Sequence, residues 1–108
     1  MIADGNNVRG STPPLVFSME PISGFSLKDL EFTLEVFSES GIGKTQFIPK
    51  SNTFPIDDNN VRYYVDTALI GTGKYYTRAH ISIPDAQAPN GVWKEVKTIE
   101  SGITINAR

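Results

Sequence analysis

The fold of this chain is decided by the stretch from Lys74 to Pro84, which reads Lys-Tyr-Tyr-Thr-Arg-Ala-His-Ile-Ser-Ile-Pro. Its residues separate by parity into two sets. The first, mostly apolar set is Tyr75, Thr77, Ala79, Ile81 and Ile83, and the second, mostly polar set is Tyr76, Arg78, His80 and Ser82. A period of two is typical of a half-buried β-strand. The stretch therefore predicts the central strand of the fold, with one face in the core.

The approach to this strand predicts a tight corner. Asp66 opens the approach, Gly71 and Gly73 provide the bend, and Pro84 ends the strand. In immunoglobulin-like sandwiches, a Tyr near the start of a late strand donates a hydrogen bond to nearby upstream backbone, an arrangement called the tyrosine corner. Tyr75 has the position of that residue. We therefore expect its ring to be buried and its hydroxyl to bind the backbone upstream.

The other alternating segments predict further short strands around the central one. From Asp29 to Phe37, one parity is apolar and the other is polar. The residues expected in the core are Leu30, Phe32, Leu34 and Val36, and those expected outside are Asp29, Glu31, Thr33 and Glu35. Residues 15–20 and 61–66 alternate in the same way, with Leu15, Phe17, Met19, Val61, Tyr63 and Val65 inward. A helix would scatter such residues around its circumference.

Proline and turn residues complete the predicted strand plan. Residues 45–49 and 54–56 are expected to be short edge strands because each contains a proline, and residues 57–60 form a hairpin tip. Asn90-Gly91 is the strongest short turn signal. Residues 92–99 and 103–105 are predicted as a last strand broken at Ser101-Gly102. This pattern predicts an all-β fold, an immunoglobulin-like β-sandwich of about seven antiparallel strands.

Length and composition narrow the domain organisation and the partners. The 108 residues suit one domain, and residues 1–14, rich in Gly, Asn, Ser and Thr, predict a flexible N-terminal arm before a sandwich over residues 15–108. A formal charge of −2 does not favour binding to nucleic acid or to an anionic membrane. Cysteine is absent from the sequence, which excludes a disulfide framework and a thiol nucleophile. No apolar run approaches the ~20 residues that span a bilayer, so we expect a soluble chain synthesised in the cytoplasm.

Several segments imitate functional motifs without meeting their requirements. Residues 41–45, Gly-Ile-Gly-Lys-Thr, match the end of a phosphate-binding loop, but Ser38 stands where the first glycine belongs and no helix start follows. Residues 57–60, Asp-Asp-Asn-Asn, lack the alternating ligands and terminal Glu of a calcium loop. His80 is the single histidine, which favours neither a zinc site nor a catalytic triad. We therefore expect no enzyme activity, no metal and no cofactor.

The polar face of the central strand is the candidate binding site. Tyr76, Arg78 and His80 share this face, and Tyr64 is expected nearby on a neighbouring strand. Aromatic side chains alternating with a cation stack on sugars or anchor a protein partner. Packing across the strands of a sheet explains the same residues equally well. The two interpretations both remain open at the level of the sequence.

A family resemblance rests on the turn motifs. These are Ser26-Leu27-Lys28-Asp29-Leu30, Asp58-Asn59-Asn60 before Val61, Asp66 through Gly73-Lys74-Tyr75, and Ile83-Pro84-Asp85-Ala86 followed by Asn90-Gly91. Over residues 15–105 the chain resembles small immunoglobulin-like sandwich proteins of prophage-like elements of gut bacteria, which are similar to the N-terminal domain of phage baseplate upper proteins. The resemblance implies a structural role in a phage tail or baseplate, incorporation into a virion or phage-like particle, and neither active site nor cofactor.

The sequence thus predicts a non-enzymatic assembly module. Its partners would be other proteins, or further copies of itself that join through sheet edges and the N-terminal arm, as the resemblance implies. The alternative is a β-sandwich module that binds a carbohydrate or a protein. A glycan remains a candidate ligand under that alternative.

Overall fold

The computed structural model describes residues 6–8, 10–39 and 44–106. Within them the strands are β1 (Asn6–Val8), β2 (Pro14–Ser18), β3 (Glu31–Ser38), β4 (Gln46–Pro49), β5 (Phe54–Asp57), β6 (Asn60–Tyr64), β7 (Gly73–Pro84) and β8 (Val92–Asn106). The helical pieces are the short helix α1 (Thr67–Ile70) and three 3-10 turns, η1 (Leu27–Asp29), η2 (Lys50–Asn52) and η3 (Pro89–Gly91). Residues 41–43 of the phosphate-loop imitation lie outside the described residues.

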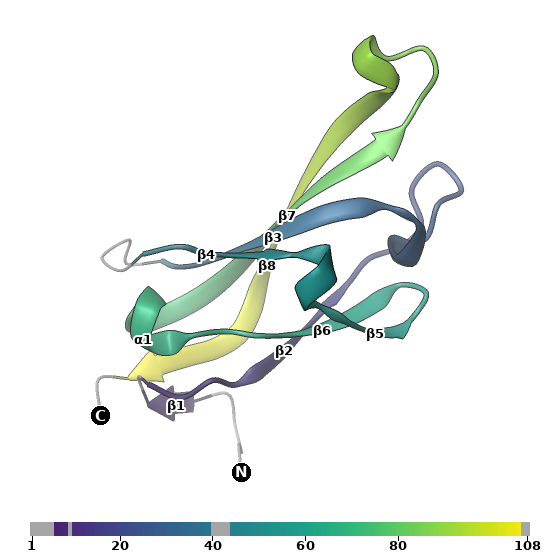
Figure 1. The fold of residues 1–108 in the computed structure, drawn as a ribbon. Helices are drawn as coiled ribbons and strands as arrows, with labels where there is room; N and C mark the ends of the chain where they lie inside the picture. Colours follow the sequence, from purple (N-terminus) through teal and green to yellow (C-terminus); the bar gives the residue numbers. More distant parts are fainter. Residues whose placement is uncertain (1–5, 9, 40–43, 107–108) are drawn as a thin grey trace.

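Two sheets form an all-β sandwich, as the alternation predicts (Figure 1). One sheet has the order β1-β8-β7-β3-β4 and the other has the order β2-β6-β5. The predicted edge strands β4 and β5 lie at sheet edges, and β7 lies at the centre of the larger sheet. The prediction of about seven antiparallel strands needs one correction. The described residues contain β1 in addition, and β1 pairs with β8 in parallel.

The core lies between the sheets and is built from the predicted inward residues. On β7, the side chains of Tyr75, Ala79, Ile81 and Ile83 have no exposed area. On β3, Leu34 and Val36 are equally buried, and Phe32 is 5% exposed. A hydrogen bond of 2.5 Å between the hydroxyls of Tyr63 and Thr77 joins the smaller sheet to the larger one inside this core. Burial of these apolar side chains drives the two sheets together.

The predicted tyrosine corner is present between β6 and β7. The Tyr75 hydroxyl donates a hydrogen bond to the carbonyl oxygen of Gly71, and both residues are buried. The bend contains the short helix α1, which the sequence did not predict. Asp66 caps this helix, because its Oδ1 accepts the N–H of Ala68 at 3.0 Å and that of Leu69 at 3.3 Å. Gly71 ends it with a φ of 103°, a left-handed value that glycine adopts without strain.

Of residues 1–14, which the sequence predicts as a flexible arm, the structure describes 6–8 and 10–14. Residues Asn6–Val8 form β1, and Pro14 already belongs to β2. Between them, the N–H of Gly10 donates to Thr67 Oγ1 at 2.7 Å, and the Thr67 hydroxyl donates to the carbonyl oxygen of Ser11 at 2.6 Å. Main-chain hydrogen bonds need no apolar side chains, so composition alone does not reveal a docked segment of this kind.

The last strand also differs from its prediction. β8 continues through Ser101-Gly102, and the expected break is a bulge. Tyr76 pairs with Glu100 while Lys74 pairs with Thr104, so β8 carries two more residues than β7 between these pairs. The turn at Asn90-Gly91 is confirmed by left-handed φ values of 63° and 77°. The β7–β8 hairpin projects beyond the other strands (Figure 1).

Candidate binding face

The outer face of the larger sheet holds three of the four predicted site residues. Tyr76, Arg78 and His80 alternate along β7 with the buried residues, so their side chains lie on the surface opposite the core. All three are partly exposed. β3 runs beside β7, with Thr33 opposite His80 and Glu35 opposite Arg78. The strand register therefore brings β3 side chains into reach of the predicted site.

Glu35 joins the two basic side chains. Its Oε1 accepts a hydrogen bond from His80 Nε2 at 2.8 Å and lies 3.3 Å from Arg78 Nη1. The Glu35 side chain is 16% exposed, whereas those of Arg78 and His80 are 38% and 37% exposed. One shielded carboxylate thus orients two groups that reach the solvent. The sequence prediction placed Glu35 outward but assigned it no role.

Aromatic rings flank this ionic group on the same face. The Arg78 guanidinium carbon lies 4.7 Å from the centroid of the Phe37 ring, which is the distance of a cation–π contact. Phe37 in turn stacks on Tyr76, with ring centroids 5.9 Å apart and planes 20° apart. On edge strand β4, Phe47 is paired with Glu35 and is 60% exposed. We call Glu35, Phe37, Phe47, Tyr76, Arg78 and His80 the Arg78 face.

Sequence reasoning missed Phe37 and Phe47 for different reasons. Phe37 has the same parity as Glu31 and Glu35, so an aromatic residue on the polar face of that strand was a signal already present in the sequence. Phe47 gave no comparable signal. Its strand is short, and only the pairing of β4 with β3 places its ring beside Glu35.

Tyr64 does not belong to this face, which corrects the predicted set. It lies on β6 in the smaller sheet, where Tyr63 points into the core and Tyr64 points to the opposite outer surface. There its ring meets that of Phe54 edge-on, with centroids 6.0 Å apart, and Tyr64 pairs with Pro14 of β2. The sequence places Tyr64 on a strand but does not say which sheet that strand joins.

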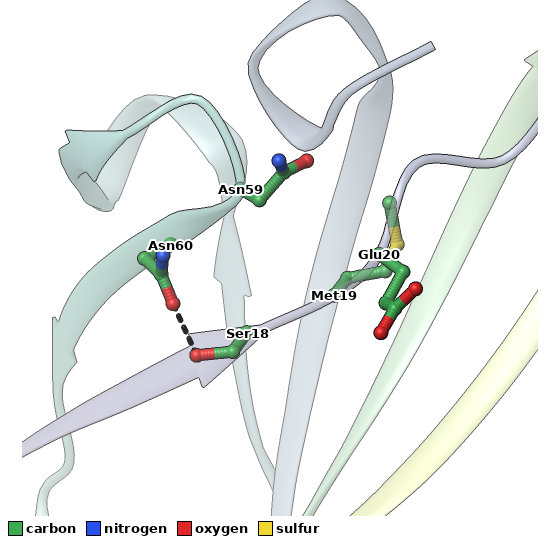
Figure 2. A pocket seen from close by; sticks show the side chains of 5 residues that line it. All are labelled: Ser18, Met19, Glu20, Asn59 and Asn60. Atoms are coloured by element: carbon green, nitrogen blue, oxygen red, sulfur yellow. Dashed lines mark hydrogen bonds between the residues drawn. The ribbon is translucent and has the colours of Figure 1, made fainter. Parts of the chain in front are cut away.

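A recess of about 240 Å³ lies at the end of β2 (Figure 2). Its lining residues are Ser18, Met19, Glu20, Asn59 and Asn60. Most of their polar groups already form hydrogen bonds within the protein. Ser18 Oγ donates to Asn60 Oδ1, and Asn59 Oδ1 accepts the N–H of Leu27 at 3.3 Å. These contacts favour a structural role for the two asparagines, which hold the β5–β6 turn against β2 and η1.

The turn at residues 57–60 is likewise held by its own hydrogen bonds. Asp57 Oδ1 accepts the N–H of Asn59 at 2.9 Å and the side-chain amide of Asn60 at 2.7 Å. Donation from the Asn59 backbone, followed by the Asn60 amide, lowers the pKa of the Asp57 carboxyl below its ordinary value. Asp58 forms an ion pair with Lys28 at 3.1 Å. Both carboxylates therefore have protein partners.

Charged pairs elsewhere on the larger sheet are exposed. Lys74 Nζ lies 3.0 Å from Glu100 Oε2, and this hydrogen bond raises the pKa of Lys74 above its ordinary value.

Within residues 6–8, 10–39 and 44–106, no group of three His, Cys, Asp or Glu side chains gathers as a metal site would require. The same part of the chain contains no helix long and apolar enough to cross a membrane.

The chain was compared with protein-family models, curated proteins and solved structures. No family model, no curated protein and no solved structure matches the chain.

Proposed function

We propose that this protein is a non-enzymatic assembly module that binds a protein partner through the Arg78 face. The setting that we propose for it is a phage tail or baseplate, in accord with the resemblance of its turn motifs. In that setting the chain would be incorporated into a virion or phage-like particle. The proposal assigns the sandwich a structural role and assigns no catalytic residue.

The observation that carries the proposal is the way Arg78 is held. Its guanidinium lies between Glu35 Oε1 at 3.3 Å and the Phe37 ring at 4.7 Å, yet its side chain remains 38% exposed. A long side chain that is already ordered loses little rotamer entropy when it binds. Arg and aromatic residues also dominate the few positions that carry most of the energy of protein interfaces. The Arg78 side chain is therefore already ordered in a position where it can contact a partner protein.

The remainder of the Arg78 face supports a protein partner. Phe47 offers an exposed aromatic ring at the edge of the sheet, and His80 and Glu35 offer polar atoms beside it. An apolar contact next to oriented polar groups is the usual composition of an interface core and its rim. The face belongs to a regular β-sheet, and a large protein surface can cover such a face.

Site-specific photocrosslinking tests this function. We expect a benzophenone amino acid in place of Phe47 to crosslink one defined protein in extracts of the native host cell. The control is the same amino acid in place of Val16, which is exposed on the smaller sheet and should give no such product. Tail or baseplate proteins among the products would support the proposed setting. The absence of any product specific to position 47 would refute the proposal.

Arginine substitutions then measure the contribution of the anchor. Arg78→Ala should weaken binding of the crosslinked partner by about tenfold or more, as expected for a central interface arginine. Arg62→Ala, on the exposed side of β6, is the matched control and should leave binding unchanged. The two variants should also unfold at similar urea concentrations, because a partly exposed ion pair contributes little stability. Equal binding by both variants would contradict the anchor role of Arg78.

A carbohydrate-binding module is the second candidate, and one observation favours it. The stacked rings of Phe37 and Tyr76 lie beside the hydrogen-bonding groups of Arg78, a combination that also suits a sugar ring. A glycan array distinguishes the two functions. Saturable binding to one sugar class that is lost in Tyr76→Ala would favour the carbohydrate function over the assembly function.

A further inference from the structure

In the part of the chain that the structure describes, the outer edge of β8 is open over most of its length. β1 pairs with β8 only at Thr104–Asn106, and no other described strand borders the edge from Val92 to Glu100. The alternate residues of this segment are exposed: Val92, Lys94, Val96, Thr98 and Glu100. A long strand edge of this kind is a template for pairing with another strand.

The direction of the main-chain groups on this edge follows from the hairpin. The N–H of Asp85 donates to the carbonyl oxygen of Gly91 at 2.9 Å, next to the pair formed by Pro84 and Val92. Hydrogen-bonded and non-hydrogen-bonded pairs alternate in an antiparallel ladder, so Val92 belongs to a non-hydrogen-bonded pair with β7. Its N–H and C=O therefore point away from β7.

The same direction repeats along the strand. Pairing between β7 and β8 continues without a shift from Val92 to Glu100. The even-numbered residues of this segment consequently present their N–H and C=O groups to the open edge. The odd-numbered residues direct theirs to β7, and their side chains lie on the core side of the sheet.

We propose that a second copy of this chain occupies this edge through antiparallel β8–β8 pairing, with the two-fold axis at Val96. The inference deepens the assembly role proposed above, on which it rests, and names one partner. The contact is made by the main-chain edge of β8, which adjoins the Arg78 face because Val96 pairs with His80. Two larger sheets would then form one continuous sheet through an isologous contact.

Charge complementarity selects this register. With the axis at Val96, Glu95 lies opposite Lys97 of the second copy, and by symmetry the same pair forms again. An axis at Glu95 would oppose two glutamates, and an axis at Lys97 would oppose two lysines. Opposite charges directly across a sheet are favourable and like charges are unfavourable. Within one chain the Glu95 and Lys97 side chains are only 3.8 Å apart at their charged atoms and remain partly exposed, so both can reach a partner.

The apolar residues agree with the same register. Trp93 lies opposite Ile99 of the second copy, and both are partly buried against the core of their own chain. Val96, which is 52% exposed, meets its own counterpart on the other side of the sheet. The odd-numbered pairs are non-hydrogen-bonded, in which facing side chains approach most closely. The register therefore pairs opposite charges and apolar residues on the core side of the sheet, and Val96 with its own counterpart on the outer side.

Sedimentation velocity over a range of protein concentrations tests the pairing. We expect the wild type to shift from monomer to dimer as concentration rises, and Val96→Pro to remain monomeric. Proline at this position removes an N–H that points to the open edge and costs no bond to β7. Lys97→Pro instead removes a hydrogen bond within the chain, so it should lower the melting temperature, whereas Val96→Pro should leave the melting temperature nearly unchanged. A wild type that stays monomeric at every concentration, or a dimer unaffected by Val96→Pro, would overturn the proposal.

Charge reversal tests the register itself. Glu95→Lys alone and Lys97→Glu alone each place like charges across the axis, and each should raise the dimer dissociation constant by about tenfold or more. Mixing the two variants places opposite charges across both pairs again, so the mixture should form a heterodimer. Failure of the mixture to associate would refute the register at Val96.

These results are separable from the proposed binding function. Val96→Pro should crosslink the protein partner through position 47 as well as the wild type does, because Phe47 lies on β4, at the sheet edge away from β8. Loss of the dimer with partner crosslinking retained would refute only the β8 inference. Retention of the dimer without a partner crosslink would refute only the proposed role of the Arg78 face.

Discussion

Neighbouring side chains on one strand of this protein have different roles, because successive residues point to opposite faces of the sheet. Adjacent tyrosines on β7 show the contrast. Tyr75 is fully buried and its hydroxyl binds the Gly71 carbonyl, whereas Tyr76 lies on the outer face and stacks on Phe37. A hydroxyl group therefore has a different energetic value at each of two successive positions.

The tyrosine pair provides a test at the scale of the residue. Tyr75→Phe removes the donor for a buried carbonyl group, so it should lower the free energy of unfolding by about 1–3 kcal/mol. Tyr76→Phe should change it by less than about 0.5 kcal/mol, because its ring contact is retained. Urea unfolding with equal m-values measures both. A larger effect at Tyr76 would show that the inward parity of β7 is assigned wrongly.

Main-chain and turn contacts hold some secondary-structure elements in addition to apolar side chains. The segment before β2 shows this, since Gly10 and Ser11 both bind the fully buried side chain of Thr67. The β5–β6 turn shows it again through the hydrogen bonds accepted by Asp57. Both elements are rich in small polar residues.

Removal of the N-terminal segment should therefore destabilise the domain. A chain that starts at Pro14 loses the pairing of β1 with β8 and leaves the buried Thr67 hydroxyl without two partners. We expect a loss of roughly 2 kcal/mol or more in the free energy of unfolding, based on the cost of unmet buried polar groups. Differential scanning calorimetry of the full and shortened chains measures it. An unchanged melting temperature would mean that these contacts contribute nothing to the fold.

The β5–β6 turn should respond to acid. The folded-state pKa of Asp57 is lowered from the ordinary 3.8, so its ionised form stabilises the fold above that pH, and this stabilisation is lost as pH falls through the folded pKa. Asp57→Ala should therefore be less stable than the wild type at pH 7, and the difference should shrink at the most acidic pH values. Urea unfolding across this range tests the prediction. A difference that grows on acidification would contradict the assigned sign.

At the scale of the whole molecule, both sheets share one apolar core, so we expect the domain to unfold as one cooperative unit. Buried residues from β2, β3, β6, β7 and β8 form a single cluster, and the Tyr63–Thr77 hydrogen bond crosses it. The unique tryptophan, Trp93, lies on β8 against this cluster. Among the residues that the structure describes, neither sheet has a separate apolar cluster of its own.

Core truncation should consequently weaken every part of the domain equally. Phe32→Ala should cost about 3–5 kcal/mol through lost burial and a residual cavity, whereas Glu31→Ala on the exposed side of β3 should have little effect. Trp93 fluorescence and far-ultraviolet circular dichroism should report the same transition in both variants. Transitions that separate between the two probes would indicate that the sheets unfold independently.

The sequence by itself determined the fold class and most of the core. Alternation assigns Leu34, Val36, Ala79 and Ile81 to the interior because the side chains of a strand change face at every residue. The corner at Tyr75 was equally predictable, since glycines and an aspartate cap define it locally. Local chemistry is sufficient for such features because all their determinants lie within a few residues.

Only the tertiary structure decided which strands become neighbours. Tyr64 belongs to the smaller sheet and Glu35 lies beside Arg78 and His80, and neither fact follows from spacing along the chain. Phe47 joins the same face through the pairing of β4 with β3, and Asn6–Val8 becomes a strand because β8 offers it a partner. Strand pairing uses main-chain groups that nearly every residue carries, so the partner of a strand is settled by packing of the whole sandwich.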